Sequence, residues 1–153
     1  MTQVRIATAV DIPQLVPMVA RYWRFERVVG FDAELVASTL AQFFVMPALG
    51  MAWLATSGGI PAGYLIGVYV FSLEHHGLTA EIDELFVLPE HRNAGIGSAL
   101  LREAEREFIH RGCTNVSLQL ARSNEPARAF YRHCGYTMRD RFELLEKALP
   151  GAA

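Results

Sequence analysis

The sequence predicts an α/β fold (an α+β mixed sheet) with helices on both faces of the sheet, in a single domain spanning residues 1–153. A chain of 153 residues can bury roughly two thirds of its unfolded surface in one core. Hydrophobic residues make up 52% and charged residues 20%, which is typical of a globular protein rather than a disordered chain. Strand-like alternation and helix-like spacing of apolar residues also replace each other several times along the chain.

The first predicted elements are one strand and two helices. Residues 3–8 alternate well enough for a strand, and Asp11 is expected to cap the helix that follows. Helical spacing of apolar residues continues until Gly30, which is expected to end this helix. A second, shorter helix is expected over residues 33–46, where Pro47 stops it.

Three strands are predicted in the middle of the chain. Residues 51–56 and 62–73 form a predicted hairpin around the turn SGGIP. The segment TAEIDELFVLP, residues 79–89, alternates acidic and apolar side chains, which indicates a strand with one face in the core.

The last third adds two amphipathic helices and further strands. A helix is predicted over residues 95–112, a strand over 114–121, and a second helix over 124–135 that begins with Asn124 as its N-cap. The segment RFELLEKAL, residues 141–149, is expected to finish the sheet. The predicted order is therefore β-α-α-β-β-β-α-β-α-β-β.

Composition argues against several classes of protein. The longest apolar stretch, residues 63–73, is about half the ~20 residues that a membrane helix needs, and the N-terminus lacks the apolar core of a signal peptide. We therefore expect a cytoplasmic protein with no membrane partner, in which Cys113 and Cys134 pack in the core. The five histidines lack ligand spacing, so no metal is expected. The net charge of −2 and the absence of a Lys/Arg run argue against nucleic acid as a partner.

Charge is distributed unevenly between the two parts of the chain. Residues 1–91 contain four arginines and nine acidic residues, a formal charge of −5, whereas residues 92–153 contain nine arginines, one lysine and seven acids, a charge of +3. An anionic ligand on the second part and a cationic one facing the first would explain this split. Surface charges scattered by chance explain it equally well.

One loop carries a candidate binding motif. In EHRNAGIGSALL, residues 90–101, two glycines lie where a predicted strand gives way to a helix. Unpaired N–H groups and the positive end of the helix dipole make such a helix start a site for phosphate. Arg92 can add a charge-assisted bond, and Asn93 tolerates a left-handed backbone. This segment alone is equally compatible with a tight turn that binds nothing.

Two motifs together point to a family. RNAGIG resembles the Arg/Gln-x-x-Gly-x-Gly/Ala signature of the GNAT N-acetyltransferase superfamily, and NEPARAFYRHCGY resembles a second conserved segment of that family. The motifs span residues 81–136, and the predicted element order agrees with the family's GNAT-like three-layer arrangement with a splayed central sheet. The chain departs from the family at Asn93 and Ala94, where Gly and then a basic or polar residue are common.

The resemblance implies a co-substrate and its binding residues. The pyrophosphate of acetyl-CoA would be held by seven loop residues: Arg92, Asn93, Ala94, Gly95, Ile96, Gly97 and Ser98. The pantetheine arm would pair, like an additional strand, with the backbone of three residues: Leu85, Phe86 and Val87. Asn124 would bond near the arm or thioester, and Arg128 would reach the nucleotide end.

The implied reaction is direct transfer of acetyl to a primary amine, with no acyl-enzyme. A base must take the amine's proton, because a lysine-like amine has a pKa of ~10.4. Strand alternation places Glu81 and Asp83 on one face and Glu84 on the other. Related transferases use a carboxylate at positions matching Glu81 or Asp83, so these are the candidate bases; each is equally compatible with a solvated or ion-paired carboxylate. The N–H of Phe86 or Val87 would meet the oxyanion.

The resemblance also assigns a proton donor. Tyr131 matches the family's usual acid for the leaving thiolate, and the alternative is an aromatic that packs beside Phe130. A retained Tyr131 favours an enzyme over the main alternative, a non-catalytic acyl-CoA-binding sensor or regulatory module of the same fold. A phosphate- or mononucleotide-binding protein outside the family is disfavoured, because the glycine loop has no Gly-Lys-Ser/Thr.

Acceptor choice is expected to depend on residues 21–34. Five side chains there are candidate walls of a cleft: Tyr22, Trp23, Phe25, Glu26 and Asp32. For the aromatic ones, packing of the helix onto the sheet is the favoured alternative. Polyamines, aminoglycosides, amino acids and protein N-termini are all open as acceptors, and if the acidic bias marks the acceptor side, a small cationic amine is expected. A homodimer, common in the family, would use exposed parts of the first two helices or the last strands.

Overall fold

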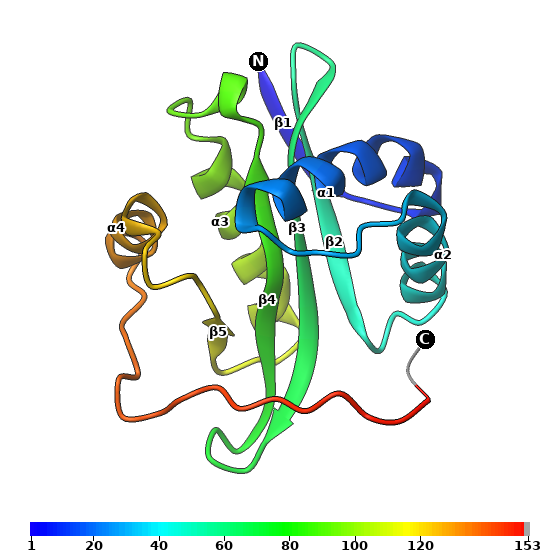
Figure 1. Ribbon diagram of the computed structural model, residues 1–153. Coiled ribbons are helices and arrows are strands. Elements are labelled where there is room, and N and C mark those ends of the chain that lie inside the picture. Colours follow the sequence, from blue (N-terminus) through cyan, green and yellow to red (C-terminus); the bar gives the residue numbers. More distant parts are fainter. Residues whose placement is uncertain (152–153) are drawn as a thin grey trace. The chain divides into compact units, whose positions relative to one another are not determined.

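The computed structural model describes residues 1–151 (Figure 1). It contains two compact units, Met1–Gln119 and the part of the chain that follows from Leu120. The first unit holds the sheet and three of the four α-helices, and the second holds the fourth. No helix within the described residues is long and apolar enough to cross a membrane.

The elements follow the predicted order as far as the last helix. In the first unit they are β1 (Thr2–Ile6), η1 (Ala9–Asp11), α1 (Ile12–Glu26), α2 (Ala33–Phe44), β2 (Gly50–Ser57), β3 (Ile60–Ser72), β4 (Gly77–Val87), η2 (Pro89–His91), α3 (Ile96–His110) and β5 (Val116–Leu118). In the second unit there is α4 (Glu125–His133).

The sheet is mixed and its last strand is short. The strand order is β1-β2-β3-β4-β5, with every pair antiparallel except β4 and β5, which are parallel. Strand β5 pairs only with residues 80–82 of β4. The second half of β4 therefore has β3 on one side and, within residues 1–119, no strand on the other. This is the splay that the resemblance implies.

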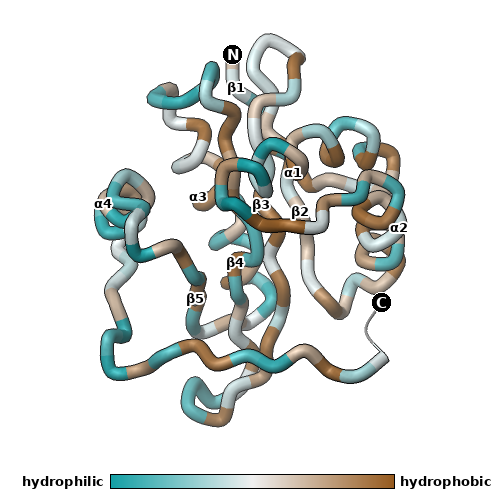
Figure 2. The backbone as a smooth tube through the Cα atoms, viewed as in Figure 1, coloured by the Kyte–Doolittle hydropathy of each residue, from teal (hydrophilic) through white to brown (hydrophobic). Residues whose placement is uncertain are grey.

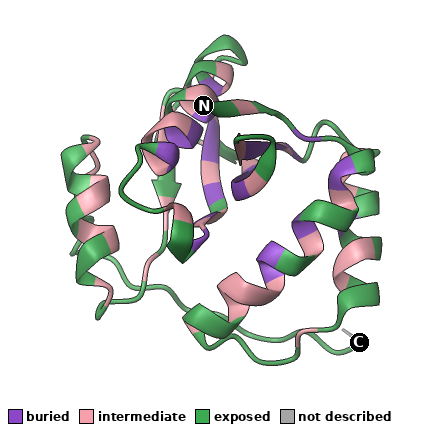
Figure 3. Cartoon of the chain, turned by 90° about the horizontal axis from the view of Figure 1, so that it is seen from above, coloured by how far each residue is buried: buried purple, intermediate pink, exposed green. Residues whose placement is uncertain are grey.

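Helices cover both faces of this sheet, as predicted. Side chains of α1 and α2, including Leu15 and Leu40, form one core cluster with Leu54, Tyr64 and Phe86 of the strands. On the other face lies α3 (Figure 1), whose buried residues are Ile96, Leu100, Leu101, Ala104 and Phe108. Buried and exposed positions alternate along the helices (Figure 3), as amphipathic spacing requires.

One glycine sets how closely α3 approaches the sheet. A Cβ atom built on Gly67 of β3 would lie 2.5 Å from Cζ of Phe108, closer than real carbon atoms approach each other. Phe108 is 1% exposed and meets Trp53 edge-on, with ring centroids 5.5 Å apart. Glycine at position 67 thus lets the Phe108 ring lie directly on the sheet.

Two helix ends differ from their predictions. Helix α1 ends at Glu26, because Arg27 takes a left-handed conformation with φ 59°, so Gly30 is not its stop. Asp11 makes no side-chain capping bond to α1. Its carboxylate instead accepts two bonds from Arg5, at 2.7 and 2.8 Å, and one from the Thr8 N–H, and the Arg5 bond is the main cause that lowers the pKa of Asp11.

The final strands of the predicted order are not formed. Residues 136–149 contain no helix or strand, so the prediction that RFELLEKAL completes the sheet is wrong, as is the β-β ending of β-α-α-β-β-β-α-β-α-β-β. Figure 2 shows that apolar and polar positions mix along this segment without a strict period of two. A strand needs a partner for its backbone groups, and the described part of the second unit contains no strand.

Candidate functional site

The loop before α3 has the backbone geometry of an anion site. Asn93 and Gly95 both have positive φ, 63° and 78°, so the left-handed backbone expected at Asn93 is present. The first helical bond runs from the Ala99 N–H to the Gly95 carbonyl at 3.0 Å, which leaves the N–H groups of residues 96–98 ahead of the helical ladder. No acidic side chain lies in the first turn of α3 to occupy them.

Arg92 links this loop to the end of β4 through a side-chain hydrogen bond. Its Nε donates to the Val87 carbonyl at 2.9 Å. Its guanidinium carbon lies 5.2 Å from the ring centroid of Phe25 and 5.3 Å from that of Phe86. The two rings and the carbonyl orient the guanidinium, so that its position is set by α1 and β4 together.

Strand β4 presents backbone groups along its open edge. The Leu88 N–H bonds to the Ala62 carbonyl of the β3 side at 2.8 Å. Backbone N–H and C=O groups alternate in direction along a strand. Those of Phe86 therefore also point to β3, whereas those of Leu85 and Val87 point to the open edge. The Val87 carbonyl already accepts from Arg92 Nε, and the expected pairing of these residues with an extended ligand stays a prediction.

A bulge interrupts β4 immediately before this edge. Ile66 pairs with Glu84 and Gly67 with Ile82, so Asp83 is the extra residue in the strand. Strict alternation would have placed Asp83 and Glu84 on opposite faces, as the sequence predicted. Both instead line the same pocket, so that prediction is wrong, and the bulge is the reason.

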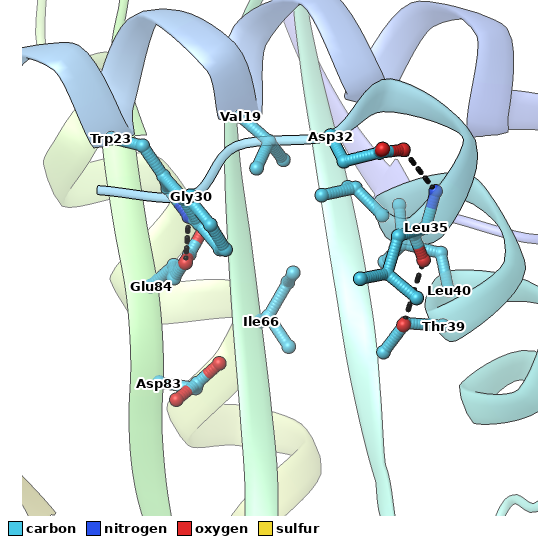
Figure 4. A pocket seen from close by; sticks show the side chains of 11 residues that line it. Val19, Trp23, Gly30, Asp32, Leu35, Thr39, Leu40, Ile66, Asp83 and Glu84 are labelled. Carbon is cyan, nitrogen blue, oxygen red and sulfur yellow. Dashed lines mark hydrogen bonds between the residues drawn. The ribbon is translucent and has the colours of Figure 1, made fainter. Parts of the chain in front are cut away.

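The pocket lies between α1, α2 and the two central strands (Figure 4). Its volume is about 210 Å³. Eleven residues line it: Val19, Trp23, Gly30, Asp32, Leu35, Val36, Thr39, Leu40, Ile66, Asp83 and Glu84. It is smaller than the ~300–1,000 Å³ usual for drug-sized ligands, which fits a small head group.

Glu84 is fixed by two hydrogen bonds. The Tyr64 hydroxyl donates to Oε1 at 2.7 Å, and the Trp23 indole N–H donates to Oε2 at 2.8 Å (Figure 4 shows the second bond). Burial raises the pKa of Glu84, and these two bonds oppose that effect. Burial is also the main cause that raises the pKa of Tyr64, so its hydroxyl stays protonated and continues to donate. The role of Tyr64 was not predicted, because nothing local in the sequence pairs it with Glu84.

Asp83 differs from its neighbour. No hydrogen-bond donor within residues 1–151 reaches its carboxylate, which lies at the open side of the pocket. Surrounding protein atoms still displace part of its water, and this desolvation raises the pKa of Asp83. Glu81 does not line the pocket, and Gln119 Nε2 approaches its Oε1 at 3.4 Å.

The expected cleft residues within 21–34 divide between two roles. Trp23 and Asp32 line the pocket. Tyr22 and Phe25 pack on Phe86, with ring centroids 5.4 and 6.2 Å away. Glu26 does not line the pocket. Its charge contributes to the raised pKa of Tyr22, but burial of Tyr22 is the larger cause. Of the two alternatives for the aromatic residues, Trp23 lines the pocket, whereas Tyr22 and Phe25 pack on the sheet.

The second unit carries the remaining predicted site residues. Asn124 caps α4 by accepting from the Ala127 N–H at 3.2 Å, as predicted. Arg128 donates to the Arg122 carbonyl at 2.6 Å. Tyr131 lies on α4, and its ring centroid is 5.1 Å from that of Phe130 and 5.5 Å from that of Tyr136. Their expected roles in binding and catalysis stay predictions.

Among the described residues, no group of three or more His, Cys, Asp or Glu side chains is placed to hold a metal ion.

The helix start with unpaired N–H groups, the open strand edge and the pocket with its carboxylates all belong to the first unit and form a candidate ligand site. The model of the acetyltransferase (GNAT) family matches residues 16–136. The chain therefore belongs to the GNAT family.

Curated relatives agree with this assignment. An acetyltransferase of Sodalis glossinidius is 32% identical over 88 residues, which cover 58% of this chain and 61% of the relative. An uncharacterized N-acetyltransferase of Archaeoglobus fulgidus is 41% identical over 61 residues, which cover 40% of this chain and 42% of the relative. The matches thus span less than two thirds of the length of either relative.

Solved structures show the same fold. An integron cassette protein from the mobile metagenome of Cole Harbour Salt Marsh has a TM-score of 0.85 and 25% identity, with 97% of this chain and 91% of that chain covered. A predicted acetyltransferase from Clostridium acetobutylicum, solved with acetyl-CoA, has a TM-score of 0.79 and 18% identity, with 95% and 96% covered.

Proposed function

We propose that this protein transfers the acetyl group of acetyl-CoA to the primary amine of a small cationic acceptor. The observation that carries the proposal is the open edge of β4, which lies between an anion-type helix start and a pocket containing Asp83. Family membership supports acetyl-CoA as the donor, and the Clostridium acetobutylicum neighbour was solved with that molecule.

The chain offers groups that fit the pyrophosphate and the pantetheine arm of acetyl-CoA. The unpaired N–H groups of residues 96–98 suit the pyrophosphate, with Asn93 and Gly95 shaping the loop around it. The backbone groups of Leu85 and the N–H of Val87 face the open edge and suit the amides of the pantetheine arm, while the Val87 carbonyl accepts from Arg92. When bound, acetyl-CoA supplies the activated acetyl group as a thioester.

Asp83 is the proposed general base. The incoming amine must be neutral to attack, so Asp83 takes its proton, directly or through a water molecule, and later releases it to solvent. Glu84 is poorly suited, because Tyr64 and Trp23 already bond both of its oxygens. Glu81 remains the alternative base, outside the pocket. The Val87 N–H, which faces the open edge, stabilises the oxyanion.

Tyr131 is the proposed acid. As the new carbon–nitrogen bond forms and the carbon–sulfur bond breaks, Tyr131 donates its phenolic proton to the sulfur, which leaves as the free thiol, and the phenolate then regains a proton from solvent. A phenol has a reference pKa of ~10 and is therefore protonated at neutral pH. The products are an N-acetylated amine and CoA.

Thiol release from acetyl-CoA, measured with and without a primary amine, tests the proposal. We expect amine-dependent release of thiol by the wild-type protein. Tyr131→Phe should lower kcat while the Kd for acetyl-CoA stays within about twofold, since the ring is retained and only the proton is lost. Binding of acetyl-CoA with no release for a wide panel of amines would instead identify a non-catalytic acyl-CoA-binding module.

A further inference from the structure

The pocket beside Asp83 is walled mainly by hydrocarbon. Six apolar side chains line it: Val19, Trp23, Leu35, Val36, Leu40 and Ile66. Val19, Leu40 and Ile66 are 3%, 7% and 8% exposed and form its buried part. Leu35 is 58% exposed although it faces the pocket, so an occupant would remove this side chain from water.

Most polar groups of the lining already have partners. Asp32 Oδ1 accepts from the Leu35 N–H at 2.9 Å, and Thr39 Oγ1 donates to the Leu35 carbonyl at 2.7 Å (Figure 4). Both oxygens of Glu84 accept protein donors. Within residues 1–151, Asp83 is the one lining carboxylate that no protein hydrogen bond reaches. A ligand thus meets an apolar surface and one carboxylate, Asp83, whose two oxygens accept no hydrogen bond from the described residues, whereas Asp32 accepts one through Oδ1 and Glu84 accepts one on each oxygen.

We propose that the acceptor is a primary amine carried on a compact apolar group, whose ammonium pairs with Asp83 and whose hydrocarbon part lies against Leu35, Trp23 and Ile66. A volume of about 210 Å³ corresponds to roughly seven water-sized groups, so an alkyl chain of about five carbons fits. A second ammonium at the far end of the chain would lose water against the apolar wall and would meet only carboxylates that already accept protein hydrogen bonds, Asp32 through Oδ1 and Glu84 through both oxygens. The inference rests on the proposed function for the amine's fate, although selective binding does not require turnover.

Equilibrium binding to the full chain with CoA present tests this selectivity. The free-amine pair is n-pentylamine and 1,5-diaminopentane, which differ by one terminal ammonium. The peptide pair is Leu-Gly-Gly and Ser-Gly-Gly, which offer the same comparison on an α-amine. We expect the apolar member of at least one pair to bind about tenfold more tightly, and the pair that discriminates identifies the source of the amine. Equal or reversed affinities in both pairs would overturn the inference.

A charge introduced at Leu35 supplies an independent test. Leu35→Glu should lower the preference for n-pentylamine over 1,5-diaminopentane by about tenfold, because it adds a carboxylate where the second ammonium would lie. The variant is expected to fold, since Leu35 is exposed and stands at the third position of α2, where Glu is favourable. Leu35→Gln separates charge from shape, and Gln42→Glu adds the same charge on α2 outside the pocket and should leave the preference unchanged. A preference unaffected by Leu35→Glu would contradict the placement of the alkyl group.

Turnover separates this inference from the proposed function. Selective binding of the apolar amine with no acetylated product would retain the inference and reject the acetyl transfer. Acetylation of 1,5-diaminopentane with a kcat/KM equal to or above that of n-pentylamine, together with equal binding in both pairs, would reject the inference and retain the acetyl transfer.

Discussion

Two adjacent carboxylates of β4 have different environments and therefore different chemistry. Glu84 is held by donors on both oxygens, so it orders Trp23 and Tyr64 around the pocket. Asp83 has a pKa raised by desolvation and no protein donor within the described residues. A carboxylate with a raised pKa is a stronger base than an ordinary one, while it remains ionised at neutral pH only if the shift is moderate. The bulge creates this difference by turning Asp83 into the pocket.

Replacing Asp83 tests both parts of this description. Asp83→Asn should lower kcat/KM for the amine by about 10²–10⁴-fold and leave acetyl-CoA affinity nearly unchanged. In the wild type, kcat/KM should rise with pH through the raised pKa of Asp83, above the ordinary value of ~3.9, because the base must be ionised. This limb should be absent in Asp83→Asn and present in Glu81→Gln.

Asp83→Asn should lower activity, but it should not lower the stability of the fold. A folded-state pKa above the unfolded one means that ionised Asp83 destabilises the fold at pH values above ~3.9. The Tm of Asp83→Asn should therefore equal or exceed that of the wild type at pH 7, with the difference vanishing toward pH 3. A lower Tm at pH 7, together with full activity, would show a structural role for Asp83 rather than a catalytic one.

At the scale of elements, one loop and one bulge decide the site, and the sequence revealed the first but not the second. Glycines and Asn93 at the start of α3 are local signals for a left-handed turn, and the structure confirms them. A one-residue bulge leaves no such signal, so alternation gave the wrong face for Glu84 relative to Asp83. Helix α1 likewise ends before Gly30, at a left-handed Arg27, a conformation that the residue type does not indicate.

The N-terminus of α3 can be tested by charge alone. Ala94 is exposed and immediately precedes the N-cap Gly95. Ala94→Glu should weaken acetyl-CoA binding by about tenfold or more, because its carboxylate competes with pyrophosphate for the N–H groups. The same charge favours the helix dipole, so Tm should not fall. Ala94→Gln, of equal shape but neutral, should bind acetyl-CoA nearly as well as the wild type; equal weakening by both variants would point to bulk rather than charge.

The contact between α3 and the sheet makes a second prediction at this scale. Gly67→Ala should destabilise the fold by about 1–3 kcal/mol, because the new methyl group would overlap the Phe108 ring. Phe108→Leu, which removes the overlapping ring atoms, should make the Gly67→Ala change less costly in the double variant. Urea unfolding of the four proteins measures this coupling. If the two changes in the free energy of unfolding were additive in the double variant, the Phe108 ring would not limit the approach of the helix to the sheet.

At the scale of the whole molecule, part of the acidic excess of residues 1–91 lies around a single pocket. The acidic first part places Asp32, Asp83 and Glu84 around one pocket, and the more basic second part begins with the loop at Arg92. Element order, the two helical faces and the family were predictable, because apolar periodicity and two motifs encode them. The expected final strands depended on long-range pairing, for which residues 136–149 carry no local signal, and they are not formed.

Calorimetric titration of the purified protein with acetyl-CoA, compared with CoA and ADP, tests the binding site most directly. We expect micromolar affinity for acetyl-CoA and clearly weaker binding of ADP, because ADP shares the pyrophosphate but not the arm that pairs with Leu85 and Val87. Absence of binding at millimolar acetyl-CoA would contradict the assignment of the α3 loop and the β4 edge as the acetyl-CoA site.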